Sequence, residues 1–123
     1  MRTLMTLGVT AVAAVALCAC AAARSPAQLA DQTTRAVYDL DYDRAVAGMD
    51  DSLKAQVTRA QIGALSDGMH NLGAYHGLTQ STSNPDAGRY DYIANFDRGT
   101  MLVLLRIDPT GKVGAYRITP TTQ

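Results

Sequence analysis

The sequence predicts an α+β fold in which short N-terminal helices pack on one face of a curved four-stranded antiparallel sheet. Upstream of Gly73, apolar residues recur at helical spacing and follow helix-capping motifs. Downstream of Gly73, apolar and polar residues alternate as they do in strands. Two turn sequences, Asp97-Arg98-Gly99 and Asp108-Pro109-Thr110-Gly111, separate the last three strands and are expected to set their register.

The composition limits the class of protein. The chain has 123 residues, enough for one domain, and its 11 basic and 11 acidic residues give a formal net charge of zero. Nucleic-acid binding requires a basic surface that neutralises phosphates, so we expect no nucleic-acid partner. Both cysteines, Cys18 and Cys20, precede the predicted helices. The folded domain therefore has no disulfide and must be stabilised by packing.

The N-terminal segment resembles a bacterial lipoprotein signal. Arg2 precedes an apolar stretch, and Leu17, Ala19 and Cys20 match the branched residue, the small residue and the lipidated cysteine of that pattern. We therefore predict a signal peptide over residues 1–19, a lipidated Cys20, a short tether over residues 20–25 and one domain over residues 26–120. The protein would then be exported and anchored to the membrane through Cys20, facing the periplasm or the cell surface.

Two alternatives remain for this segment. Cleavage within residues 21–23 also satisfies the small-residue rule and would release a secreted protein. A retained transmembrane helix is the other alternative, although the segment is rich in alanine and lacks a flanking stop-transfer cluster.

The helices are predicted from their start and stop signals. Ser25 to Gln28 and Thr58 to Gln61 are capping boxes, the first with Pro26 at the first helical position. Two shorter helical segments are expected between them, and Gly73 is a suitable residue to end the last helix. The apolar positions at helical spacing are Leu29, Thr33, Ala36, Val37, Leu40, Tyr42, Ala45, Val46, Met49, Leu53, Val57, Ile62, Leu65, Met69 and Leu72.

Four strands are predicted after these helices. The first covers residues 75–82 and is followed by the loop of residues 84–88. In the third strand Met101, Val103 and Leu105 share one face, while Leu102 and Leu104 make the opposite face apolar as well. A strand with two apolar faces is central or covered on both sides, which indicates either a strongly curved sheet or a homodimer formed through the sheet.

Several short segments carry a resemblance to a known fold family. They are Tyr42-Asp43-Arg44-Ala45, Leu72-Gly73-Ala74-Tyr75, Phe96-Asp97-Arg98-Gly99-Thr100, Gly111-Lys112-Val113 and Pro120. With helices that precede an antiparallel meander, the chain resembles the nuclear transport factor 2-like superfamily. Within it, the chain is similar to exported bacterial domains of unknown function that occur alone or ahead of α/β-hydrolase domains. The resemblance implies a cone-shaped domain with a pocket between helices and sheet.

Few residues are candidates for chemistry. The two histidines, His70 and His76, flank the predicted helix end, and Tyr75, Tyr90 and Asp91 are candidates for a pocket or its rim. A helix-end role for the histidines and a strand role for the tyrosines are the simpler interpretations. No cysteine remains in the domain to ligate a metal, so we expect no metal site. Phosphate-binding and nucleophile-elbow motifs are also missing, and no cofactor or catalytic residue is predicted.

The functional hypothesis follows from export and fold together. We favour a non-enzymatic binding or accessory domain of the cell envelope, whose partner is a small apolar ligand or an envelope protein. The alternative is a small acid–base enzyme, because relatives by fold such as ketosteroid isomerases use Asp, His and Tyr in the cone. An Asp or His deep in the pocket and within about 3.5 Å of a Tyr hydroxyl would favour the enzyme. A pocket lined by apolar residues would favour binding.

Overall fold

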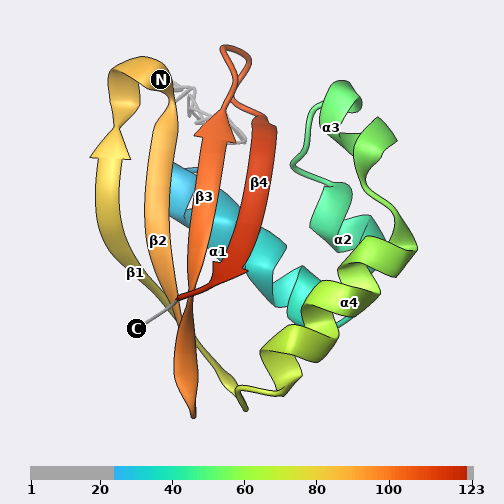
Figure 1. Ribbon diagram of the computed structural model, residues 1–123. Helices are drawn as coiled ribbons and strands as arrows, with labels where there is room; N and C mark the ends of the chain where they lie inside the picture. Colours follow the sequence, from blue (N-terminus) through green and yellow to red (C-terminus); the bar gives the residue numbers. More distant parts are fainter. Residues whose placement is uncertain (1–23, 122–123) are drawn as a thin grey trace, which may run out of the picture.

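The computed structural model describes residues 24–121, and it confirms the α+β class (Figure 1). Helices come first and strands follow, in the order that the sequence predicts. The helices are α1 Pro26–Tyr38, α2 Tyr42–Val46, α3 Asp51–Gln56 and α4 Arg59–His70. The strands are β1 Tyr75–Asn84, β2 Arg89–Phe96, β3 Gly99–Ile107 and β4 Val113–Pro120, with a 3-10 turn, Pro85–Ala87, between β1 and β2.

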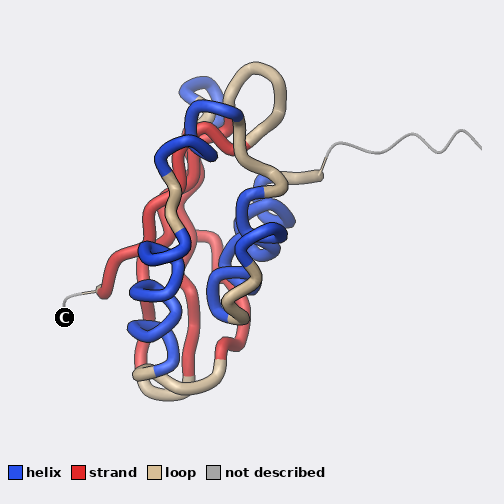
Figure 2. The backbone as a smooth tube through the Cα atoms, turned by 90° about the vertical axis from the view of Figure 1, so that its right-hand side faces the viewer, coloured by secondary structure: helices blue, strands red, loops and turns tan. Residues whose placement is uncertain are grey.

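The sheet is an antiparallel meander in the order β1-β2-β3-β4. Helix α1 lies across one face of the sheet, and α3 and α4 lie beside its β4 edge (Figure 1 and Figure 2). We call the sheet face that the helices cover the inner face, and the opposite one the outer face. The cysteines and the predicted signal and tether up to residue 23 lie outside the described residues. Within residues 24–121, no helix is long and apolar enough to cross a membrane.

The core lies between the helices and the inner face of the sheet. Strand alternation places one set of side chains on this face, and those side chains are buried. The buried residues of β2, β3 and β4 are Tyr92, Ala94, Phe96, Met101, Val103, Leu105, Val113 and Ile118. The helices contribute Leu29, Ala30, Ala36, Val37, Ala45, Ile62 and Met69 to the same core, and Met49 joins it from the segment between α2 and α3.

Both predicted capping boxes are present. Ser25 and Gln28 cap α1 reciprocally, and Thr58 and Gln61 do the same for α4. In each box two backbone N–H groups at the helix start donate to side-chain oxygens, which fixes where the helix begins. The predicted turn before β4 also forms, because the Asp108 carboxylate accepts hydrogen bonds from the backbone of Thr110 and Lys112.

Leu40, the last apolar position of the first predicted helix, differs from the sequence prediction. The apolar periodicity extends to Leu40, but α1 ends at Tyr38 and Leu40 is 60% exposed. Leu40 has a φ of 59°, which turns the chain out of the helix. The backbone N–H groups of Leu40 and Asp41 donate to the carbonyls of Val37 and Ala36, the pattern of a Schellman motif.

Candidate functional site: an apolar pocket beside the last strand

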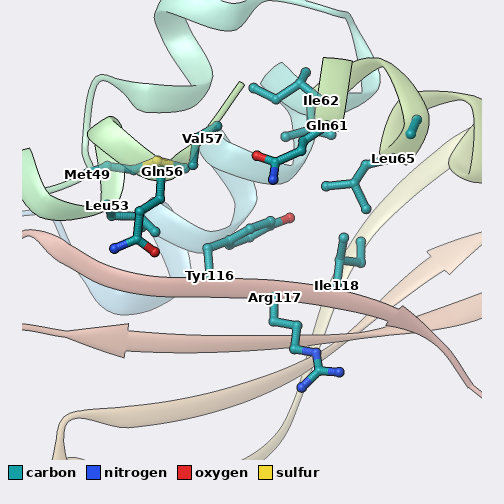
Figure 3. Close-up of a pocket in the computed structure, with 12 residues that line it drawn as sticks. Met49, Leu53, Gln56, Val57, Gln61, Ile62, Leu65, Tyr116, Arg117 and Ile118 are labelled. Atoms are coloured by element: carbon teal, nitrogen blue, oxygen red, sulfur yellow. The ribbon is translucent and has the colours of Figure 1, made fainter. Parts of the chain in front are cut away.

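A pocket of about 540 Å3 lies between the α3–α4 segment and strand β4 (Figure 3). Most of its lining side chains are apolar, and they come from the helices on one side and from the sheet on the other. The lining residues are Val37, Met49, Leu53, Gln56, Val57, Gln61, Ile62, Ala64, Leu65, Tyr116, Arg117 and Ile118. Pockets of this size and character are where proteins bind small apolar molecules or the side chains of a partner.

Tyr116 supplies a polar atom to the pocket wall, and the hydrogen bonds of its hydroxyl fix the direction of its proton. The Thr34 hydroxyl donates to the Ala30 carbonyl at 2.7 Å, so its single hydrogen is in use. The 2.8 Å contact between the Tyr116 and Thr34 hydroxyls is therefore a bond that Tyr116 donates. Burial also raises the pKa of Tyr116 above its usual value. Tyr116 consequently stays neutral and offers a ligand lone pairs rather than a proton.

Gln61 supplies the complementary group. Its Oε1 accepts a hydrogen bond of 2.9 Å from the Thr58 backbone N–H, as the capping box requires. That bond places the amide nitrogen on the other side, and in Figure 3 the Gln61 side chain extends toward Tyr116. The pocket thus presents a hydrogen-bond donor from Gln61 and an acceptor from Tyr116 within an otherwise mostly apolar surface. Such a wall can orient a ligand that has one polar group.

The lining lacks the groups that acid–base catalysis requires. Among the described residues that line this pocket, none is Asp, Glu or His. Arg117 is the charged member, and its side chain points away from the cavity (Figure 3), so its backbone forms that part of the wall. The chemistry that this pocket can perform is therefore recognition by shape and hydrogen bonding.

Two of the residues singled out in the sequence, His70 and Tyr75, lie in an aromatic cluster outside the pocket. The His70 ring stacks on Tyr38 with centroids 4.0 Å apart, and Tyr75 packs at 6.3 Å from the same tyrosine. The Nδ1 atom of His70 lies 2.8 Å from the Ser66 carbonyl one turn earlier. This cluster joins α1, the end of α4 and the start of β1, and Phe96 completes it.

His76 lies next to this cluster in sequence but faces solvent. It pairs with Asp97 of the β2–β3 hairpin through its Nε2 atom, and both side chains are about half exposed. The same carboxylate accepts a 2.8 Å hydrogen bond from the Ala74 N–H. His76 thus belongs to a surface contact between the hairpin and the start of β1.

Tyr90 and Asp91 lie at the opposite end of the sheet from the histidines. Tyr90 is half-buried on the inner face, and Asp91 is on the outer face, where it accepts a 2.8 Å hydrogen bond from Thr82. About 20 Å of strand separates the start of β2, where these residues lie, from its end next to Tyr75. The five candidates from the sequence therefore do not converge on one site.

One Asp–Tyr pair has the distance expected of an acid–base pair. The Tyr75 hydroxyl donates to Asp31 at 2.8 Å, and Asp31 also pairs with Arg35 at 2.9 Å. Burial and the nearby carboxylate raise the pKa of Tyr75 well above its usual value. This cluster lies outside the pocket lining, and the Asp31 and Arg35 side chains are 38% and 48% exposed. The Asp31–Tyr75 pair is therefore close enough for acid–base catalysis, but it does not lie deep in the pocket.

In residues 24–121, no group of three or more His, Cys, Asp or Glu side chains is placed to hold a metal ion. At the level of class, the fold is that of an α+β domain with helices on one face of a four-stranded antiparallel sheet. Comparison of the chain with protein families, curated proteins and solved structures finds no match.

Sequence reasoning missed most of the pocket because its members come from separate elements. Tyr116 and Thr34 are 82 positions apart, and nothing in a single sequence links them. Gln61 was predicted as a capping residue, but its position in the pocket wall depends on the orientation of α4 relative to β4. The useful signal was the phase of β4, since Tyr116 and Ile118 share the face that the helices cover.

Proposed function

We propose that this protein is an envelope-anchored lipoprotein whose folded domain is a non-enzymatic binding module of the nuclear transport factor 2-like type. The ligand would be a small, mainly apolar molecule, or the apolar part of an envelope protein, held between α3–α4 and β4. The observation that carries the proposal is the mostly apolar pocket of about 540 Å3, with neither carboxylate nor imidazole in its described lining.

The kind of ligand follows from two polar groups of the wall, the Gln61 amide and the Tyr116 hydroxyl, to which Gln56 adds a third polar side chain. The Gln61 amide can donate and the Tyr116 oxygen can accept, so a ligand with one hydroxyl or amide group suits the pocket best. An unpaired charge would be disfavoured, because no described carboxylate lines the cavity and the Arg117 side chain points away from it. The ordering of helices ahead of a meander supports the comparison with the cone-shaped family.

A pocket-filling substitution tests the proposal. Ala64 lines the pocket from an exposed position of α4, so Ala64→Trp can fill the cavity without enlarging a core residue. We expect the full chain in maltoside micelles to bind the neutral dye N-phenyl-1-naphthylamine above the level of empty micelles. Ala64→Trp should abolish that excess. The chain has no other tryptophan, so Trp fluorescence reports on the filled pocket directly.

Ala60→Trp is the matched control. Ala60 is exposed on the same helix but does not line the pocket, so dye binding should match that of the wild type. Equal dye binding by all three proteins, or none by the wild type above empty micelles, would contradict the proposal.

The acid–base alternative has one supporting observation, the Asp31–Tyr75 hydrogen bond. Asp31→Asn separates the two functions because this residue does not line the pocket. We expect Asp31→Asn to leave dye binding unchanged. A loss of binding in this variant with an unchanged melting temperature would place the functional centre at Tyr75 instead.

A further inference from the structure

We propose that the natural occupant of the pocket is an extended peptide segment that pairs with the free edge of β4 and inserts apolar side chains into the cavity. This inference rests on the proposed function, since it names the kind of partner for the same pocket. It starts from the backbone of β4, whose Arg117 contributes to the pocket wall while its side chain points away (Figure 3).

Strand β4 is at one edge of the sheet, so one side of its backbone has no neighbouring strand. The Thr121 N–H donates to the Thr100 carbonyl of β3 at 3.4 Å, which fixes the alternation of the antiparallel ladder. The backbone N–H and C=O groups of alternate residues in β4 then point away from β3, and these residues include Tyr116 and Ile118. Pro120, which has no N–H to donate, occupies another outward position.

The outward groups of Tyr116 and Ile118 have no hydrogen-bond partner among residues 24–121. They form two donor–acceptor pairs at a spacing of two residues, which is the pattern that an added strand recognises. The side chains of the same two residues line the pocket. An extended peptide on this edge would therefore satisfy the backbone and reach the cavity at once.

The start of β4 already has such a neighbour. The Val113 N–H donates to the Gly48 carbonyl at 2.8 Å, and the Asp50 N–H donates to the Val113 carbonyl at 2.9 Å. This segment makes a parallel bridge through Met49 and then turns into α3 instead of continuing along the edge. The edge accepts a strand-like segment at Val113, and no segment among residues 24–121 pairs with the outward backbone groups of Tyr116 and Ile118.

The charge of Arg117 indicates which residue the peptide carries between its two apolar side chains. Side chains opposite Tyr116 and Ile118 would enter the pocket, and the side chain between them would lie on the outer face next to Arg117. Arg117 is exposed and makes no ion pair within the part of the chain that the structure describes. An acidic residue at the central position is therefore favoured, which gives an apolar–acidic–apolar pattern.

The strand at the other edge offers no such combination. Most of β1 beyond Leu78 is exposed and polar, and none of its residues lines the apolar pocket. The edge of β4 therefore differs from the edge of β1 in having an apolar cavity beside it. The apolar side chains of a bound peptide would enter that cavity.

Thr-Leu-Asp-Leu-Thr, with fluorescein on its N-terminal amine and an amidated C-terminus, is a suitable probe for the full chain in maltoside micelles. We expect saturable binding by fluorescence anisotropy, weakened about tenfold when the peptide carries N-methyl groups on the backbone nitrogens that face β4. Exchanging the central Asp for Lys should weaken binding about threefold, and Arg117→Glu should reverse that preference. Arg98→Glu, in the turn between β2 and β3, should leave the preference unchanged.

A matched pair of variants tests the edge itself. Ile118→Pro removes an outward N–H, whereas Ile118→Ala shortens the side chain and keeps the N–H. We expect Ile118→Pro to bind the peptide about fivefold to tenfold more weakly than Ile118→Ala. The N-methylated peptide keeps the test decisive if either variant fails to fold.

The outcomes separate the two proposals. Dye binding that Ala64→Trp blocks, together with no peptide binding, would overturn this inference and leave the proposed function in place. Peptide binding that is insensitive to backbone N-methylation would also overturn it, because strand addition requires those hydrogen bonds. Absence of both dye and peptide binding would overturn both proposals.

Discussion

At the scale of single residues, Asp97 fixes the junction between α4 and β1. Its carboxylate accepts hydrogen bonds from the Ala74 N–H and from His76, and its own N–H donates to the Ala74 carbonyl at 3.2 Å. Gly73 lies against it, where an added Cβ would come within 2.6 Å of the Asp97 side chain. The sequence identified Asp97 and Gly73 as a turn residue and a helix end, but not as contacts of each other.

The contacts of Asp97 make stability depend on pH. The Ala74 N–H, followed by His76, lowers the pKa of Asp97 below its ordinary value. A carboxylate with a lowered folded-state pKa contributes stability above its unfolded pKa of about 3.9, and the contribution is lost as pH falls through the folded value. We therefore expect Asp97→Asn to lower the melting temperature at neutral pH and to flatten its decline between about pH 5 and pH 2.

Asp86→Asn is the control for this prediction. Asp86 is exposed in the 3-10 turn, and its carboxylate makes no hydrogen bond to the described residues. The melting temperature of the Asp86→Asn variant should follow that of the wild type from neutral to acid pH. If Asp97→Asn and Asp86→Asn had the same profile, the carboxylate would not hold the junction.

At the scale of elements, helix starts were predictable and the left-handed conformation that ends α1 was not. A capping box is a local sequence pattern, so Ser25 and Thr58 could be identified without knowledge of the fold. The end of α1 depends on Leu40 adopting a left-handed conformation that most L residues avoid. The apolar periodicity gave no sign of this, because leucine there looks like one more buried position.

The strained position of Leu40 leads to a prediction of increased stability. Leu40 is 60% exposed, so little buried surface is lost when its side chain is removed. Glycine adopts a positive φ without the steric cost, which is about 1–2 kcal/mol for an L residue. After the greater flexibility of glycine in the unfolded chain is subtracted, Leu40→Gly should raise the free energy of unfolding by about 0.5–1 kcal/mol.

Urea denaturation measures this change, and Asp39→Gly provides the comparison. Asp39 is the preceding residue and has an ordinary helical φ of −82°, so glycine relieves no strain there. We expect Asp39→Gly to destabilise the protein. Equal effects at the two positions would show that the left-handed conformation of Leu40 is not costly.

Part of the pocket wall was predictable from the sequence, and part was not. The meander and the face assignments of β2 and β3 follow from alternation, so the inner wall of the domain was predictable. The pocket required knowing how α3 and α4 are placed beside the edge of β4, which depends on long-range packing. Leu65 illustrates the difference, since its helical spacing indicates an apolar face but not that it lines a pocket half-buried.

At the scale of the whole molecule, the outer face of the sheet has no covering helix among the described residues (Figure 1). Leu102 and Leu104 are half-buried there, as is Ile93, which pairs directly with Leu102. Partly exposed apolar residues on a sheet face are consistent with the homodimer that the sequence suggested. Positive charge on the same face opposes such an association.

Arginines border this apolar strip. Arg89 and Arg106 are direct cross-strand partners, and Arg117 pairs with Leu104 on the neighbouring strand. The three arginines and Asp91 line a cleft of about 890 Å3 on this side of the sheet. None of the three makes an ion pair within residues 24–121. Two copies that met through this face would bring like charges together, and repulsion would oppose the burial of the leucines.

Salt should therefore strengthen self-association. Electrostatic screening shortens from about 30 Å at 0.01 M salt to about 3 Å at 1 M, whereas the apolar contribution remains. We expect light scattering of the full chain in maltoside micelles to show a shift from monomer toward dimer as sodium chloride is raised. Leu104→Ser should remove the dimer at every salt concentration, while Leu40→Ser, the same change at an exposed leucine outside this face, should not. A strict monomer at high salt and high protein concentration would instead mean that the outer face is used by another partner or stays exposed to solvent.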